Sequence, residues 1–420
     1  MEKGHISIHA QNIMPIIKKW LYSDKDIFLR ELVSNGCDAI AKHSLLALRG
    51  ETAAEENYRV DVVCDPDAGT LTISDNGIGM TEEEVVKYIA QVAFSGAEEF
   101  LAQYKPEEGE SGGIIGHFGL GFYSSFMVSG KVEINTRSWQ ADAPAVRWIS
   151  EDGMAYEIGQ SDRSGRGTSI TLYLNEDDKE FLNQYTVRTT LEKYCAFMAT
   201  PIYLSHIETA AEKEAKEKAA VEAAEKAAKE AAEKDQEHAS DEIIDDEDMI
   251  DDDIIDEPAP EKGPEQINET HPLWLKRPAD ITDDEYLDFY RKVFHDYEKP
   301  LFWIHLNAEY PFNLKGILYF PKIKNEFTSN EGEVKLFNNQ VFVADNIKEI
   351  IPEFLLLLKG VVDCPDLPLN VSRSFLQNDG YVKKLSTYIR IRKNCGRTIV
   401  STRSETAVDA AIKIKEIRAG

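Results

Sequence analysis

One charged stretch divides this chain into two parts. Between Glu208 and Lys262 the sequence carries 22 acidic residues against 7 lysines. Like charges at this density repel one another and keep a chain extended, so the stretch is not expected to join a packed core. We therefore expect two folded parts, over residues 1–207 and 266–389, with an acidic linker over residues 208–265 between them.

The linker has two halves of different composition. Residues 208–234 consist mainly of Ala, Glu and Lys, which favour a helix, and their opposite charges recur three or four positions apart. Residues 235–262 are mostly acidic and contain Pro258 and Pro260 near their end. We interpret the whole stretch as a solvated spacer, because charge runs of this kind rarely pack. A docking segment for basic partner proteins is the alternative.

Composition excludes several classes of protein. The net charge of −28 argues against nucleic acid as the main partner, because phosphate binding needs clustered Lys and Arg. No run of about 18 apolar residues is present, so no membrane span is expected, and the first residues do not resemble a signal peptide. Five scattered cysteines without a C-x-x-C pair predict reduced thiols, no zinc site and a cytoplasmic location.

A helix is predicted over residues 25–48, after a shorter amphipathic helix over residues 13–21. Its two faces differ: Leu29, Val33 and Ile40 cluster on one side, and Glu31, Asn35, Asp38 and Lys42 on the other. The polar face is either simply solvated or part of a site. Asn35 and Gly36 are poor helix formers, and Gly36 suggests that another group approaches the backbone closely.

The next motif follows two predicted strands, over residues 58–64 and 70–74. The second strand runs into the sequence DNGIGM, which starts at Asp75. A carboxylate at a strand end can accept a hydrogen bond from an amino group that lies over the following glycines. Asn-Gly is also a common hairpin turn, so the motif alone is only moderately specific.

A glycine-rich loop is the third element, with Gly116, Gly119 and Gly121 ahead of a predicted helix over residues 122–128. Its glycines allow successive backbone N–H groups to point at an anion. The loop lacks the G-K-[ST] end of a Walker A motif, and no βαβ order surrounds it. The fourth element is an alternating strand over residues 167–174, in which Thr168 would otherwise be an ordinary strand-edge residue.

The order of these elements resembles the ATP-binding domain shared by gyrase, histidine kinases, mismatch-repair ATPases and the ninety-kilodalton heat-shock chaperones. The strings YSDKDIFLRELVSNGCDAI, ISDNGIGMT, IIGHFGLGFYSSFMVS and GTSITLYL are similar to the chaperone family in its bacterial form. After the linker, INETHPLWLKRPADITDDEYLDFY and VFVADNIKEIIPEFLLLLKGVVDCPDLPLNVSRSFLQ resemble that family's middle domain. The implied fold class is α+β: a two-layer α/β sandwich that binds ATP, followed by a partial α/β middle domain.

The resemblance also implies roles for individual residues. Glu31 would orient and deprotonate the attacking water, and Asn35 would bind Mg²⁺ through its side-chain oxygen. From the second part, Arg373 would reach the γ-phosphate of ATP with the assistance of Gln377. The remaining residues of the implied nucleotide site are Asp38, Asp75, Gly79, Met80, Gly116, Gly119, Gly121, Phe122 and Thr168, of which Asp75, Gly79 and Thr168 would bind adenine and the glycine loop with Phe122 the phosphates.

The function implied is an ATP-dependent chaperone that closes on ATP and assists the folding of client proteins. Full-length members of the family are homodimers, and their dimerisation domain is not matched in this sequence. A truncated fragment that binds nucleotide or client without productive turnover is the alternative, and a histidine kinase a distant third. Residues 390–420 are expected to be unlike the family, which suggests a truncated or frame-shifted product.

Three positions depart from the family pattern. Phe94 and Glu98 occupy the lid segment where better-known members carry lysines, so a lid lysine is not expected to contact phosphate. Ser374 replaces the usual Glu next to Arg373.

Overall fold

The computed structural model describes residues 24–91, 96, 99–100, 115–116, 119–215, 218, 221, 263–308, 313–322, 332–345, 358–367 and 369. Several predictions fall outside these residues: the helix over 13–21, most of the linker, the tail over 390–420, and the side chains of Phe94, Glu98, Arg373, Ser374 and Gln377.

The first sheet carries the motifs from the N-terminal half of the chain. Among the described residues it has eight strands, in the order β5-β4-β3-β6-β2-β1-β7-β8. Their bounds are β1 Val60–Asp65, β2 Thr70–Asp75, β3 Ser129–Arg137, β4 Val146–Ser150, β5 Glu157–Gln160, β6 Gly167–Leu174, β7 Ile202–His206 and β8 Glu265–Gln266. Most neighbours are antiparallel, but β1 and β7 are parallel. The strands predicted around the motifs are present as β1, β2 and β6.

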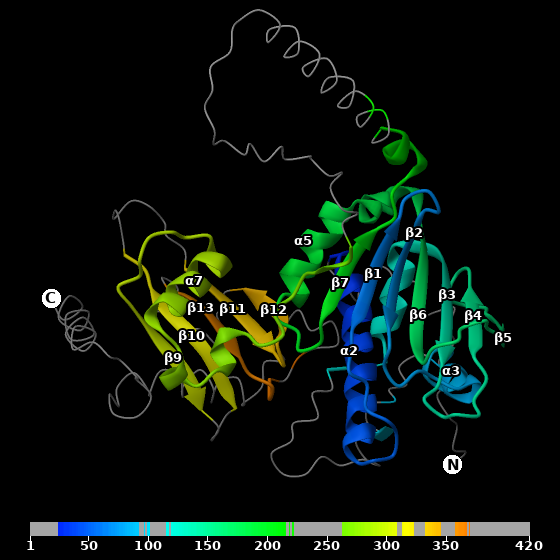
Figure 1. Ribbon diagram of the computed structural model, residues 1–420, viewed down its shortest axis with the longest axis horizontal. Helices are drawn as coiled ribbons and strands as arrows, with labels where there is room; N and C mark the ends of the chain where they lie inside the picture. Colours follow the sequence, from blue (N-terminus) through cyan, green and yellow to red (C-terminus); the bar gives the residue numbers. More distant parts are fainter. Residues whose placement is uncertain are drawn as a thin grey trace, which may run out of the picture.

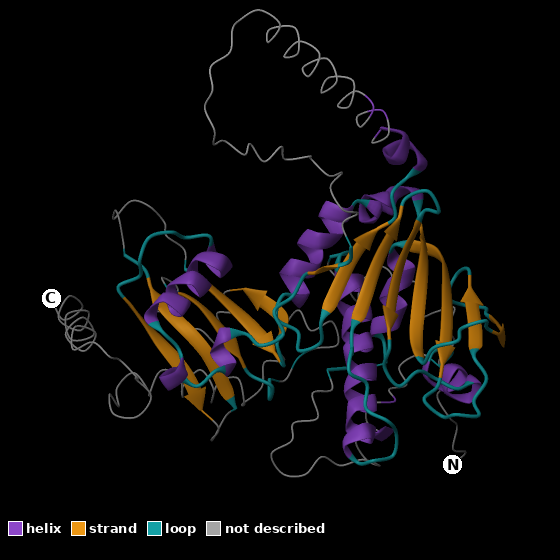
Figure 2. Cartoon of the chain, viewed as in Figure 1, coloured by secondary structure: helices purple, strands orange, loops and turns teal. Residues whose placement is uncertain are grey.

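Alternation of side chains explains why these segments form one half-buried sheet. In β1, for example, Val60, Val62 and Cys64 are buried, and the residues between them are partly exposed. Because successive side chains of a strand point to opposite faces, one face of the sheet is apolar and must be covered. Helix α2 (Ile27–Leu48) covers it, packed on β1 and β2 (Figure 2).

Smaller helices complete the layer beside α2. They are α3 (Glu82–Tyr88), η2 (Gly121–Met127), η3 (Glu176–Leu182) and α5 (Gln184–Cys195), and both η2 and α5 contact α2. The helix predicted after the glycine loop is present as η2, and it is a 3₁₀ helix. Serine hydroxyls that bond back to main-chain carbonyls favour such tight turns, as Ser124 does to Gly121.

A second sheet lies on the other side of α5 (Figure 1). In the described part of the chain its five strands run in the order β12-β11-β13-β10-β9. The bounds are β9 Phe302–Ala308, β10 Leu314–Phe320, β11 Glu333–Asn338, β12 Val341–Asp345 and β13 Lys359–Asp363. Helix α7 (Asp283–Phe294) packs on it, and the short helices η4 (Leu273–Leu275) and η5 (Pro278–Asp280) precede α7. Together, sheets and helices give the α+β class that the sequence predicts.

The two sheets share one apolar core through a cluster of aromatic rings. Phe197, which follows α5, lies edge-on to Trp274 with ring centroids 4.7 Å apart. Both rings also contact Phe337 on β11, at 5.6 and 5.3 Å. The chain returns from the linker as β8, which pairs with β7 of the first sheet. The end of the linker therefore belongs to the first sheet.

No helix in the described ranges is long and apolar enough to cross a membrane. The four described cysteines are free and buried, and burial raises the pKa of the Cys37 and Cys64 thiols to about 12. Residues 210–215 are helical, as predicted for the first half of the linker.

Candidate functional site

The polar face of α2 is not a solvated face. Glu31 is only 3% exposed and Asp38 only 6%, while Asn35 is half-buried. Charged groups are costly to bury without partners, so each must be paired or hydrogen-bonded. Arg30 donates from Nε and Nη2 to Glu31 Oε1, at 3.1 and 2.9 Å. The interpretation of this face as simply solvated is therefore wrong, and its interpretation as part of a site stays a prediction.

The strand end at Asp75 lies directly against α2. Asp75 closes β2, opposite Thr168 of β6. Gly36 of α2 is close enough that a Cβ there would lie 3.4 Å from Asp75 Cβ and 3.2 Å from Val60. The close approach expected at Gly36 is therefore confirmed, and Asp75 is one of the groups that makes it.

Burial controls the charge of Asp75. Its Oδ1 accepts a 2.7 Å hydrogen bond from the Gly77 N–H. Burial raises the pKa of the Asp75 carboxyl to about 6, although the Gly77 N–H and the Arg163 guanidinium both act to lower it. Above that pH the group is a buried carboxylate, which is a strong acceptor for an amino group.

The glycines and hydroxyls beside Asp75 complete this corner. Gly79 has a left-handed backbone (φ 63°), and a Cβ there would collide with the Arg137 carbonyl oxygen. The Met80 N–H donates to Thr136 Oγ1 at 3.0 Å, and Thr136 Oγ1 lies 2.9 Å from Thr168 Oγ1. Gly79, Met80 and Thr168 are thus brought together with Asp75.

The glycine loop reaches the polar face of α2 at two points. Asp38 accepts hydrogen bonds from the N–H groups of Ile115 and Gly116, both at 2.6 Å. In this arrangement the Gly116 N–H is bonded to Asp38, so a bond from it to phosphate would require Asp38 to release it. Further along, a Cβ on Gly121 would lie 2.7 Å from Glu31 Oε2. The first residue of η2 therefore lies against the carboxylate of Glu31.

The other loop residues have different roles in the structure. Gly119 has a left-handed backbone (φ 63°), which suits glycine. Phe122 is buried, and its ring packs edge-on to Phe126 and Trp148. Its side chain therefore belongs to the core, and only its backbone is available to a ligand. No group of three or more His, Cys, Asp or Glu in the described residues is arranged to hold a metal.

Sequence reasoning missed several residues of this site. One is Arg30, which precedes Glu31 directly and is 1% exposed, but which no sequence pattern singles out. Ser34 lies on the same helical face as Glu31 by periodicity, and its buried hydroxyl has no hydrogen-bond partner in the structure. Gly167 has φ 106°, and a Cβ there would collide with the Asp75 carbonyl oxygen. The only sequence signal was the Gly-Arg-Gly pattern ahead of Thr168.

Comparison with known families is consistent with this geometry. The family described as histidine kinase-, DNA gyrase B-, and HSP90-like ATPase matches residues 23–152, which include α2, Asp75 and the glycine loop. The family described as Hsp90 protein matches residues 180–404, just over half of the chain. The second match ends inside residues 390–420, the segment expected to be unlike the family.

Curated relatives agree with both matches. Chaperone protein HtpG of Porphyromonas gingivalis is 46% identical over 389 residues, which cover 92% of this chain and 50% of the relative. The protein of the same name from Bacteroides thetaiotaomicron is 45% identical over 390 residues, 93% of this chain and 50% of the relative. That of Geobacter metallireducens is 36% identical over 403 residues, 94% and 56% respectively. The chain thus spans about half the length of the curated relatives it matches, and it belongs to the Hsp90 family.

Proposed function

We propose that this chain binds and hydrolyses ATP, and that nucleotide-driven closure lets it assist the folding of client proteins. The observation that carries the proposal is the meeting of three elements at one place. A buried carboxylate at the end of β2, the polar face of α2 and the glycine loop before η2 are in contact through Asp75, Asp38 and Glu31.

Adenine would bind at the Asp75 corner. Above about pH 6 the Asp75 carboxylate accepts a hydrogen bond from the exocyclic amino group, with Gly79 leaving room beside it and the Thr168 hydroxyl close by. The buried Ser34 hydroxyl, which lacks a partner, is a further group that a bound ligand or water would satisfy.

Phosphates would bind toward the glycine loop, with Gly119, Gly121 and the backbone of Phe122 as donors. The half-buried amide of Asn35 offers the hard oxygen that Mg²⁺ prefers, and Mg²⁺ when bound would neutralise phosphate charge. Glu31 would accept a proton from the attacking water at its carboxylate. Its Oε1 is held by Arg30, which fixes the group but also competes for the same oxygen.

Closure requires a second contact, which we assign to Arg373 with Gln377. A planar, permanently charged guanidinium suits the stabilisation of a transferring phosphoryl group. ATP then favours the closed state, because only that state offers this contact. Client binding, homodimer formation and a cytoplasmic location are parts of the same proposal. They remain proposals because the relatives named as chaperones are about twice as long as this chain.

A second candidate function is nucleotide or client binding without productive turnover. It is favoured by two bonds in the site: Arg30 holds Glu31, and Asp38 holds the Gly116 N–H. Turnover would need both to rearrange.

Glu31→Ala distinguishes the two candidates. We expect the variant to bind ATP about as well as the wild type, because adenine recognition depends on Asp75. Its steady-state hydrolysis should fall by about 100-fold or more, since general-base catalysis contributes roughly 10²–10⁴. Calorimetry and a phosphate-release assay measure the two quantities. Wild-type affinity without turnover would favour the second candidate, and normal turnover in the variant would exclude Glu31 as the base.

A further inference from the structure

Two arginines hold the loop that carries Asp75. Both come from the segment between β5 and β6. Arg163 Nη2 donates to the Asp75 carbonyl at 3.1 Å. Arg166 Nη1 donates to the carbonyl of Asn76 and, at 2.7 Å, to that of Gly77. Three successive carbonyls of this loop are therefore bound by guanidinium groups.

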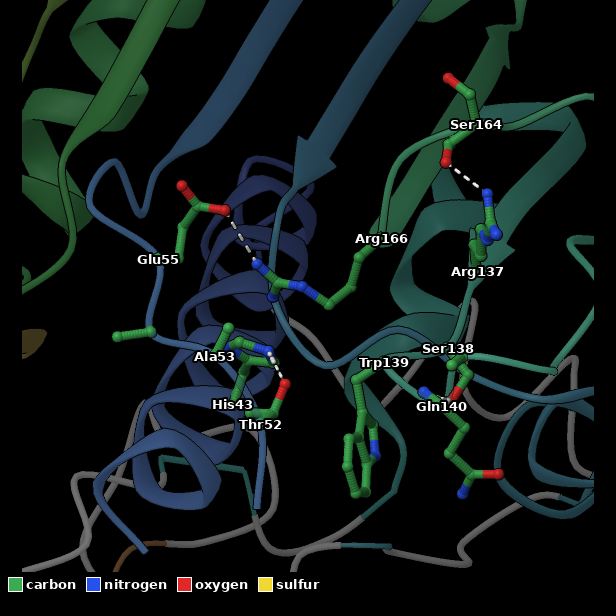
Figure 3. A pocket seen from close by; sticks show the side chains of 12 residues that line it. His43, Thr52, Ala53, Glu55, Arg137, Ser138, Trp139, Gln140, Ser164 and Arg166 are labelled. Carbon is green, nitrogen blue, oxygen red and sulfur yellow. Dashed lines mark hydrogen bonds and ion pairs between the residues drawn. The ribbon is translucent and has the colours of Figure 1, made fainter. Parts of the chain in front are cut away.

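Arg166 is itself held from the opposite side. Its Nη2 lies 3.1 Å from Glu55 Oε2 (Figure 3). The guanidinium also lies over the Tyr58 ring, 6.0 Å from its centroid. A cavity of about 340 Å³ opens beside it, with Arg137, Trp139 and Gln140 in its lining. Arg166 thus spans from this cavity to the backbone of the loop that carries Asp75.

Because a peptide unit is planar, the contacts of Arg166 with these carbonyls also set the direction of the N–H groups that follow them. The Asn76 carbonyl and the Gly77 N–H belong to one planar peptide unit, so the direction of one fixes the direction of the other. That Gly77 N–H holds Asp75 Oδ1 at 2.7 Å. The next peptide unit joins the Gly77 carbonyl, also bound by Arg166, to the Ile78 N–H, which donates to Ala39 of α2 at 2.9 Å.

We propose that Arg166, supported by Arg163, is a positioning residue for nucleotide binding: it orients the peptide unit between Asn76 and Gly77 so that the Gly77 N–H holds the Asp75 carboxylate in place for adenine. The inference rests on the proposed function, because it concerns the same site. Arg166 acts through the loop and does not touch the base.

The same contacts oppose the cost of burying the Asp75 charge. The groups that face Asp75 are the Gly77 N–H, the Arg163 and Arg166 guanidiniums and the backbone of Thr168, all of which lower its pKa, and the Cys37 thiol of α2. Loss of Arg166 removes one positive charge and loosens the Gly77 bond. Both changes raise the pKa of Asp75 above its present value of about 6.

Adenosine binding across pH 5–8 tests the proposal, because adenosine carries no phosphate that titrates in this range. In the wild type, affinity should fall as the pH drops through about 6. In Arg166→Gln, affinity at pH 7.5 should fall about tenfold, the value of one charge-assisted hydrogen bond, and the midpoint should move to higher pH. Arg166→Lys should return the midpoint toward that of the wild type but recover only part of the affinity, since an ammonium lacks the fork that reaches two carbonyls.

Arg147→Gln is the matched control. Arg147 lies on β4 of the same sheet, away from the loop that carries Asp75, and forms two hydrogen bonds with Glu133, at 2.8 Å each. The Arg147→Gln variant should leave both the adenosine affinity and the pH midpoint unchanged. If Arg166→Gln does not fold, Glu55→Gln replaces it: this change frees Arg166 from its anchor without removing a contact to the loop, and a smaller shift in the same direction is expected.

Amide hydrogen exchange in the ligand-free protein separates this inference from the proposed function. Exchange at Gly77 and Ile78 should be faster in Arg166→Gln and unchanged in Arg147→Gln. Faster exchange together with no adenosine binding even by the wild type would refute the nucleotide function while supporting the orientation of the loop by Arg166. If the adenosine affinity, the pH midpoint and the amide exchange of Arg166→Gln all equal those of the wild type, the inference is overturned.

Discussion

At the scale of single residues, the site depends on how a buried charge is stabilised. Asp75 is an example in which sequence position and environment both matter. A carboxylate after a strand and before glycines could be identified from the sequence. Its raised pKa could not, because burial raises it and the guanidiniums of Arg163 and Arg166, which lie far along the chain, act to lower it.

Asp75→Asn should abolish most nucleotide affinity. An amide replaces one acceptor oxygen with a donor, so it cannot reproduce the bond from an ionised carboxylate, and about 3 kcal/mol of binding free energy should be lost. The pH dependence gives a second readout. The wild-type pKa of about 6 predicts that adenosine affinity is full above this pH and lost below it, whereas the Asn variant has no such transition. Calorimetry at pH 5, 6.5 and 8 measures both, and equal affinity at pH 8 would exclude Asp75 as the adenine acceptor.

The residues that the sequence missed have a common physical origin. Arg30 and Ser34 looked like ordinary helix positions, because only the packing of η2 and α5 on α2 makes that face buried. Gly167 and Arg166 act on a loop that is distant in sequence. Periodicity reports the local face of an element, but it cannot report what covers that face.

At the scale of elements, the site depends on how closely the Asp75 loop approaches α2. Gly77 shows this best, since a Cβ there would lie 2.6 Å from the Ile40 nitrogen. The next residue donates its N–H to the Ala39 carbonyl. The loop and the helix are thus in backbone contact.

Gly77→Ala should therefore lower both stability and adenosine affinity. The added methyl group meets backbone and cannot be accommodated by a side-chain rotation, so the loop must move; overpacking of this kind costs roughly 1–3 kcal/mol. Gly165→Ala is the control, because a Cβ there meets nothing within 4 Å. Chemical denaturation and adenosine titration measure the two effects. Equal stability of the two variants would show that the contact between loop and helix is not tight.

Secondary structure near the motifs could be predicted well, because it depends on the spacing of apolar residues that are close together in the sequence. The helix over residues 25–48 and the strand over residues 167–174 correspond to α2 and β6, whose apolar residues recur in the sequence at the spacing of a helix and of a strand. A helix after the glycine loop could also be predicted, but its 3₁₀ geometry in η2 could not. The position of β8 in the first sheet also had no local signal, because its two residues are exposed and lie at the end of the linker.

At the scale of the whole molecule, the linker separates two sheets in sequence but not in space. Asn268 shows how they are joined again. It donates to the Met198 and Thr200 carbonyls at 2.7 and 2.8 Å, and accepts from the Ile202 N–H at 2.8 Å. Just beyond it, Trp274 is 1% exposed and donates from Nε1 to Asp363 of β13 at 3.3 Å. A displacement of one sheet at this junction should therefore be transmitted to the other sheet.

Trp274→Ala tests whether the two sheets unfold as one unit. Trp274 contacts Phe197 of the first part and Phe337 of the second, so its removal takes away one of the rings that join them and leaves the direct contact between Phe197 and Phe337. The loss should cost about 3–5 kcal/mol, the usual range for a buried Trp. Because both sheets contribute to one apolar core, the wild type should unfold in a single calorimetric transition, and the variant in two.

Trp303→Ala is the control. Trp303 contacts Tyr286 and Tyr319 within the second part only, so its loss should lower the melting temperature and keep one transition. A single transition in Trp274→Ala would mean that the remaining ring contacts, Phe197 with Phe337 and Tyr194 with Phe342, suffice to couple the sheets.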